Sequence, residues 1–72
     1  MKQGLVMDEI NQDLLKRIAE NPGLSMIEIG EPYLQRMSEA AVRLRIRELR
    51  NKGFIKLEKT RHNITRCYPA EA

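Results

Sequence analysis

The chain has 72 residues, of which 42% are hydrophobic and 32% are charged, and its 13 basic and 10 acidic side chains give a net charge of +3. That length provides for one small domain, excludes a second one and leaves little room for an enzymatic cleft. No apolar run reaches the roughly 20 residues that a membrane helix needs, and the first ten residues lack the apolar stretch of a signal peptide. We therefore expect a cytoplasmic protein with a single domain over 1–72 and an ordered core at about 8–69.

The first predicted element is an amphipathic helix over about 8–20. Asp8 can cap its N-terminus, and apolar residues then recur on one helical face while the other face is polar. The sequence Asn21-Pro22-Gly23 ends the helix, because proline cannot continue the hydrogen-bonded ladder and glycine tolerates the turn. The apolar positions are Ile10, Leu14, Leu15 and Ile18.

A second, short helix is predicted near 26–31. Ser25 and Glu28 have the spacing of a capping box, in which each side chain binds a backbone N–H at the start of the helix. A further partial turn is expected over 33–37. Within it, Leu34 and Met37 are three residues apart, and both are expected to face inward.

The clearest helix in the sequence runs over 39–52. Ser38 can cap its start, and Gly53 stands at the position where helices commonly end. At about 100° per residue, one buried stripe is expected to contain Val42, Ile46 and Leu49. The opposite, outward face carries Ala40, Arg43, Leu44, Arg47, Glu48 and Asn51.

After this helix, the period of the hydrophobic pattern changes to two, which predicts a β-hairpin over 54–69. The first strand is expected over 54–59, the turn over 60–63 and the second strand over 64–69. The register stays open, since a slip of one residue decides whether Cys67 or Tyr68 points toward the core.

The charges are segregated along the chain. Residues 1–42 contain 4 basic and 7 acidic side chains, a net charge of −3, whereas residues 43–66 contain 9 basic and 2 acidic side chains, a net charge of +7. A basic block of this kind attracts polyanions, and nucleic acid is the usual one. A solvated basic face without a ligand is the alternative interpretation.

The order of the predicted elements resembles the winged helix-turn-helix domains of small bacterial and archaeal regulators of the MarR, ArsR and Lrp types, over about residues 8–69. The sequence SEAAVRLRIRELRNKGFI at 38–55 is the most specific part, since it is similar to a recognition helix that leads into a wing. The resemblance implies an α+β fold, mainly α, with three helices followed by a two-stranded hairpin wing. The connection over 30–37 departs from the common pattern, because it is about two residues longer.

This resemblance implies sequence-specific binding of double-stranded DNA by a transcriptional regulator, with helix 39–52 in the major groove and hairpin 54–69 as the wing. Arg43 and Arg47 are candidates for reading guanine, and Leu44 for contacting a thymine methyl group or a partner chain, although each can also be a merely exposed residue. The wing residues would contact phosphates. The candidate DNA-binding residues are Ser38, Ala40, Arg43, Leu44, Arg47, Asn51, Lys59, Arg61 and His62.

The alternative function is a winged-helix protein–protein interaction module that acts with a larger DNA-binding partner. A homodimer is a further possibility, formed through the first helix, the arm 1–7 or the C-terminal tail. Recognition of single-stranded RNA is disfavoured, since the chain has two Tyr, one Phe and no Trp for stacking. His62 and Cys67 are too few for a zinc site and lack the pocket of a nucleophilic enzyme, so we expect no metal, cofactor or catalysis.

Overall fold

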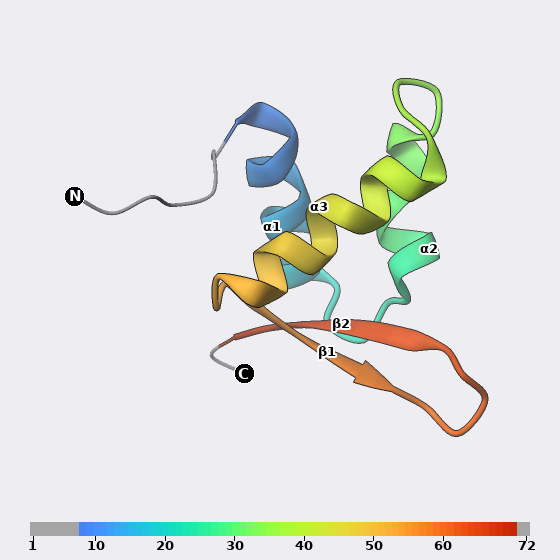
Figure 1. The fold of residues 1–72 in the computed structure, drawn as a ribbon. Helices are drawn as coiled ribbons and strands as arrows, with labels where there is room; N and C mark the ends of the chain where they lie inside the picture. The colour runs from blue at the N-terminus through green and yellow to red at the C-terminus, as the bar shows by residue number, and fades with distance from the viewer. Residues whose placement is uncertain (1–7, 71–72) are drawn as a thin grey trace.

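Each α-helix is preceded by a residue whose side chain accepts a hydrogen bond from a backbone N–H of the first turn. This holds throughout residues 8–70, the part of the chain that the computed structural model describes (Figure 1). The helices are α1 (Glu9–Glu20), α2 (Met26–Gly30) and α3 (Glu39–Asn51). The observed caps confirm the predicted helix starts, which could be predicted because a cap depends on residues close together in the sequence. The caps are Asp8 for α1, Ser25 for α2 and Ser38 for α3.

The connection between α2 and α3 differs from the expectation. A short 3-10 helix, η1 (Glu31–Tyr33), directly follows α2, with Pro32 in its first turn. The side chain of Tyr33 is buried, whereas Leu34 is 45% exposed, so the prediction that Leu34 faces inward is wrong. The tighter winding of η1 changes which residue points to the core. Met37 is partly buried against the core, as expected.

The hairpin consists of β1 (Ile55–Lys59) and β2 (Thr65–Pro69), which pair antiparallel. Leu57 lies opposite Cys67 in the register, and Cys67 is completely buried. The open question of the register is thereby answered, since Cys67 points to the core and Tyr68 lies on the other face.

Several boundaries differ from the prediction by one residue, since α2 ends at Gly30 and the strands begin at Ile55 and Thr65. The last residue of α3 is Asn51, and Lys52 forms the cap. The side chain of Phe54 is 44% exposed. Phe54 lies outside the strand, because its backbone N–H donates to the carbonyl oxygen of Leu49 at 3.0 Å. That bond closes the C-terminal end of α3 around Gly53, whose φ is +87°.

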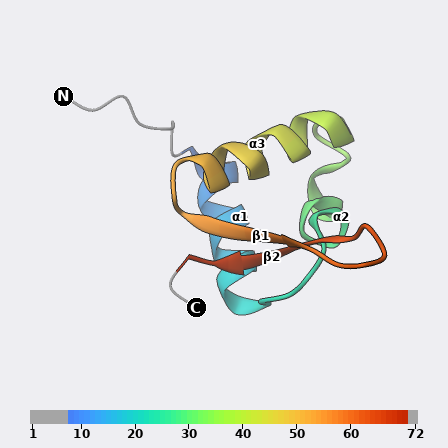
Figure 2. The same ribbon diagram turned by 60° about the horizontal axis from the view of Figure 1, so that its bottom comes forward.

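The hairpin is joined to the turn between α1 and α2 by backbone hydrogen bonds. The N–H of Gly23 donates to the carbonyl oxygen of Cys67 at 2.8 Å, and the N–H of Cys67 donates to the carbonyl oxygen of Leu24 at 2.8 Å. Ser25 and Arg66 form an isolated antiparallel bridge at the same place. We call this pairing of residues 23–25 with β2 the seam. It sets the hairpin alongside α3, with the hairpin loop at the same end as α2 (Figure 2).

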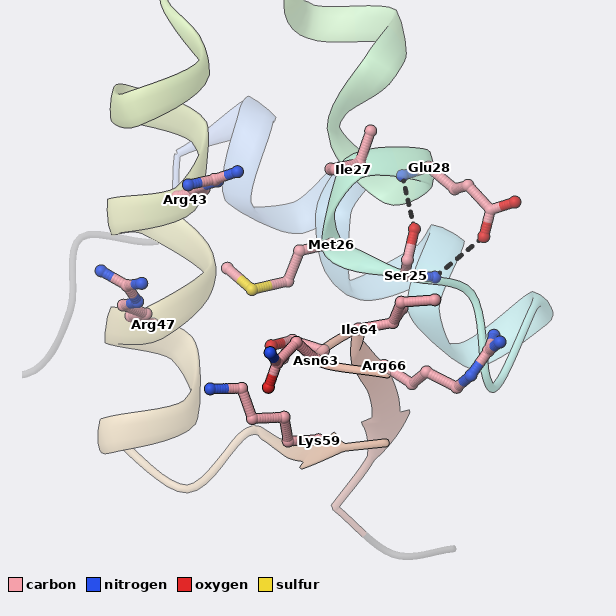
Figure 3. Close-up of a pocket in the computed structure, with 11 residues that line it drawn as sticks. Ser25, Met26, Ile27, Glu28, Arg43, Arg47, Lys59, Asn63, Ile64 and Arg66 are labelled. Atoms are coloured by element: carbon pink, nitrogen blue, oxygen red, sulfur yellow. Dashed lines mark hydrogen bonds between the residues drawn. The ribbon is translucent and has the colours of Figure 1, made fainter. Parts of the chain in front are cut away.

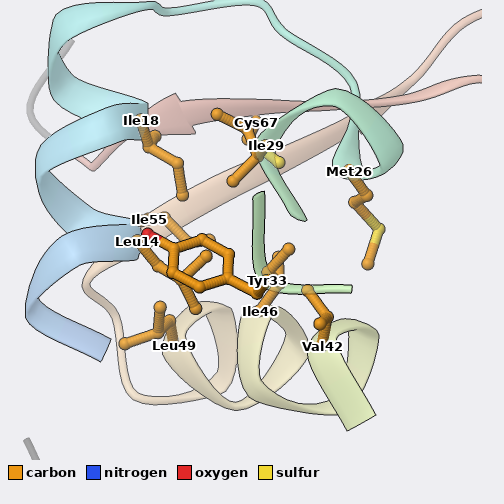
Figure 4. Close-up of a cluster of buried hydrophobic side chains, with 10 residues drawn as sticks. All are labelled: Leu14, Ile18, Met26, Ile29, Tyr33, Val42, Ile46, Leu49, Ile55 and Cys67. Carbon is orange, nitrogen blue, oxygen red and sulfur yellow. The ribbon is translucent and has the colours of Figure 1, made fainter. Parts of the chain in front are cut away.

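The core takes buried side chains from every helix and strand (Figure 4). The predicted stripe of α3 is confirmed, since all three of its residues are buried. The domain is therefore a mainly helical α+β fold in which one apolar cluster holds the helices on the hairpin. The buried core residues are Leu14, Ile18, Met26, Ile29, Tyr33, Val42, Ile46, Leu49, Ile55 and Cys67.

A polar network joins the start of α1 to the middle of α3. The Nη1 atom of Arg45 donates to both carboxylate oxygens of Asp8, at 2.9 and 3.0 Å, and to Oδ1 of Asn11 at 3.0 Å. Asn11 is buried, so these bonds satisfy a polar side chain inside the fold. The network fixes the position of α3 along α1.

Candidate nucleic-acid interface

A groove of about 530 Å³ lies between α3, the start of α2 and the hairpin (Figure 3). We call it the α3–hairpin groove. It brings together segments that are far apart in the sequence, because the seam holds the hairpin beside the start of α2. The groove is lined by Ser25, Met26, Ile27, Glu28, Arg43, Arg47, Lys59, Asn63, Ile64, Thr65 and Arg66.

The position of the basic residues follows from the burial of α3. Its apolar stripe faces the core, so Arg43 and Arg47, which are one turn apart, are exposed on the side of the groove. Lys59 is the last residue of β1 and reaches the groove from the hairpin. Together with Arg66, these side chains place four cations around one groove. Such a cluster raises the local positive potential.

The four cations differ in their bonding. Arg43 donates from Nη2 to Oε2 of Glu39 at 3.0 Å, and Arg66 donates from Nη1 to the carbonyl oxygen of Gly23 at 2.7 Å. Within residues 8–70, the side chains of Arg47 and Lys59 make no hydrogen bond or ion pair. Their charges are therefore available to a ligand, whereas Arg66 stabilises the seam.

The start of α2 contributes a fixed carboxylate to the groove. Oε1 of Glu28 accepts a hydrogen bond from the backbone N–H of Ser25 at 2.9 Å, and Oγ of Ser25 accepts from the N–H of Glu28 at 3.1 Å. The bond from the Ser25 N–H lowers the pKa of Glu28, as do the Ser25 hydroxyl and the charge of Arg66. Glu28 therefore remains negatively charged beside Arg66.

Arg17 of α1 fixes the orientation of α2 at the groove. Its guanidinium donates from Nε to the carbonyl oxygen of Ile29 and from Nη2 to that of Glu28, each at 3.1 Å. These carbonyl groups belong to a helix of only five residues, which a charged donor helps to hold.

Apolar side chains complete the lining. Met26 is buried at the start of α2, while Ile27 and Ile64 are exposed, and all three contribute to the groove. The groove thus combines cations with apolar surface. A nucleic-acid strand presents the matching pair of features, since charged phosphates alternate with sugars along its backbone.

The structure brings three of the predicted site residues into the groove and leaves the others outside it. Arg43, Arg47 and Lys59 lie together there. The remaining six are exposed but do not line the groove. Of these, Ser38 is the cap of α3, and Oδ1 of Asn51 accepts from Nε of Arg50 at 2.9 Å. The six residues are Ser38, Ala40, Leu44, Asn51, Arg61 and His62.

Sequence reasoning missed the contribution of α2 and of the loop side of the hairpin. The capping box located the start of α2, but no local signal indicated that the preceding residues pair with β2. Asn63 has a φ of 65°, a turn conformation that asparagine tolerates better than most residues, and this preference is visible in the sequence. Its proximity to α3 depends on the seam, which is a long-range contact.

The two residue types considered for metal or nucleophilic chemistry lie in different surroundings. Cys67 is in the core, where burial raises the pKa of its thiol to about 11, and His62 is in the exposed hairpin loop. Within the described range 8–70, no group of three or more His, Cys, Asp or Glu side chains is placed to hold a metal ion. In the same range, no helix has the length and apolar character required to cross a membrane.

No protein-family model, curated protein or solved structure matches this chain. The functional assignment accordingly rests on the chain's own residues, in particular the free cations of the α3–hairpin groove.

Proposed function

We propose that this protein is a winged helix-turn-helix transcriptional regulator that binds double-stranded DNA in a sequence-specific manner. The observation that carries the proposal is the α3–hairpin groove, which gathers Arg43, Arg47 and Lys59 from a helix and a hairpin. Two of these cations have no partner within residues 8–70. A helix flanked by a basic hairpin is an arrangement that suits the grooves and phosphates of duplex DNA.

In the proposed complex, α3 enters the major groove, which is roughly 12 Å wide and admits a helix. Arg47 offers its guanidinium to the two acceptors of a guanine edge. Lys59, together with Arg61 and His62 in the hairpin loop, contacts phosphates. The first set of contacts specifies sequence and the second positions the domain.

The proposed role is binding without catalysis or a cofactor. The buried thiol of Cys67 remains protonated at neutral pH because of its raised pKa, and it does not line the groove. The groove presents charge and apolar surface, which are properties of a docking site.

Selection from randomised duplex DNA at two salt concentrations tests the proposal directly. We expect an enriched motif after sequencing of the retained pool, and retention that falls as salt rises because counterions are released on binding. Absence of retention at low salt contradicts the proposal. A palindromic motif would indicate binding as a dimer.

Substitutions in the groove separate its two kinds of contact. Arg47→Ala is expected to lower affinity for the selected motif by about 1–3 kcal/mol and to relax the preference at one base pair. Lys59→Ala is expected to weaken binding to all sequences and to reduce the salt slope by about 1. Lys16→Ala is the matched control, because Lys16 is exposed on α1 outside the groove. Equal effects of all three variants would contradict the proposed division of roles.

A second candidate function, a protein-interaction module acting with a larger DNA-binding partner, is favoured by exposed apolar side chains. Ile27 is 59% exposed, and Leu34 lines the same shallow depression between α2 and α3. Exposed neighbouring apolar residues are typical of protein contacts. In the selection experiment, weak salt-sensitive retention without an enriched motif would support this function over sequence-specific binding.

A further inference from the structure

Glu39 is the first residue of α3, and its carboxylate forms an ion pair with Arg43, one of the cations of the groove. Oε2 of Glu39 accepts a hydrogen bond from Nη2 of Arg43 at 3.0 Å, four residues along the helix. The two side chains are 55% and 45% exposed, respectively, so the pair forms in contact with water. Arg43 is thus the groove arginine whose charge is compensated by a neighbouring carboxylate, in contrast to Arg47.

We infer that Glu39 determines specificity by making Arg43 favour a neutral base edge over a phosphate, an inference that rests on the proposed DNA-binding function. A guanidinium has five N–H donors, and the bond to Glu39 engages a donor on Nη2. The remaining donors can still bind the two acceptors of guanine, which carry no net charge.

A phosphate meets a different situation at the same arginine. It must either approach the carboxylate of Glu39, which repels it, or replace that carboxylate and exchange one anion for another. Arg43 therefore gains little from backbone contacts, which are the contacts that hold a protein on random sequence. Lys59, the groove cation that contacts phosphate in the proposed complex, has no such competitor among the described residues.

The role of Glu39 can be tested without damage to the fold. Exposed ion pairs contribute little to stability, and glutamine is also a good helix former. Glu39→Gln therefore removes the charge and retains α3. Glu20→Gln is the matched control, because Glu20 is an exposed residue at the end of α1 that does not line the groove.

The experiment compares dissociation constants for the selected duplex and for a random-sequence duplex over a range of salt concentrations. For Glu39→Gln, we expect affinity for random duplex to rise roughly fivefold at 0.15 M salt and the salt slope to steepen by about 0.9, because Arg43 then neutralises one more phosphate. Affinity for the selected duplex should change no more than in Glu20→Gln. The ratio of specific to random affinity therefore falls.

The same change in the Arg43→Ala background shows whether Glu39 acts through Arg43. We expect Glu39→Gln to leave the specificity ratio unchanged there, since no guanidinium remains to be released. An unchanged ratio in the single variant, with the motif still selected by the native protein, would overturn this inference alone. Failure of the native protein to retain any duplex would instead overturn the proposed function.

Discussion

Asp8 has two roles that meet at one carboxylate. Its Oδ1 caps α1 by accepting from the N–H of Asn11 at 2.9 Å, and both of its oxygens accept from Arg45 of α3. The bond from Asn11, followed by that from Arg45, lowers the pKa of Asp8 below its ordinary value of 3.8. Protonation therefore weakens a helix cap and a contact between helices together.

The stability of the domain should depend on pH through this group. Because the pKa of Asp8 is lower in the folded state, its contribution is complete above about pH 4 and is lost as pH falls through the folded value. Thermal unfolding followed by circular dichroism between about pH 2 and pH 7 measures how the contribution of Asp8 to stability changes with pH. We expect Asp8→Asn to lower Tm at pH 7 and to reduce the fall of Tm on acidification.

Glu20→Gln serves as the control for this titration, since its side chain is exposed at the opposite end of α1. It should keep the acid dependence of the native protein. A pH profile of Asp8→Asn that parallels the native profile would show that the carboxylate of Asp8 does not carry the effect. Glu28, whose pKa is also lowered, maintains some acid dependence in every variant.

At the scale of elements, α2 packs tightly against α3 at Gly30. A Cβ atom built there would lie 2.5 Å from Cγ1 of Val42, a separation that side chains do not tolerate. Val42 is buried and β-branched, so it has little freedom to move aside. The absence of a side chain at residue 30 therefore sets the distance between the two helices that border the groove.

Gly30→Ala should destabilise the domain by about 1–3 kcal/mol, which is the usual cost of overpacking a core. For a domain of this size, each kcal/mol corresponds to a decrease in Tm of roughly 4–8 °C. Val42→Ala removes the atom that would clash, so the double variant should lose less stability than the sum of the single variants. A strictly additive loss in chemical denaturation would contradict this packing argument.

The helices and strands also show which features of the fold can be predicted from the sequence. Caps and periodicity are local, so Asp8, Ser25 and Ser38 marked the helix starts, and the stripe of α3 predicted that Arg43 and Arg47 point outward. The seam and the inward turn of η1 depend on contacts between distant residues. Eight of the eleven residues that line the groove were therefore not among the predicted site residues, which include only Arg43, Arg47 and Lys59 of the lining.

At the scale of the whole molecule, the arm 1–7 and the last two residues of the tail, which were considered as parts of a dimer interface, lie outside the described residues. The rest of the chain shares one apolar cluster, to which every helix and strand contributes. A shared core of this kind favours unfolding in a single cooperative step. The seam strengthens that coupling, because it joins the hairpin to the turn between the first two helices.

Cooperative unfolding makes the single cysteine a measurable reporter. The side chain of Cys67 is completely buried, so an alkylating reagent should reach it only when the hairpin separates from the helices. We expect labelling of the native protein at about pH 8 to be slower than in denaturant by a factor close to the folding equilibrium constant. A factor much smaller than that constant would show that the hairpin opens without unfolding of the helices.

The position of this thiol at the seam has a practical consequence for any ligand of the groove. A molecule that binds only the closed domain must slow the labelling of Cys67 in proportion to its occupancy, even though Cys67 never touches it. One sulfur atom in the core thus provides an intrinsic binding assay that needs neither a fluorophore nor a known target sequence.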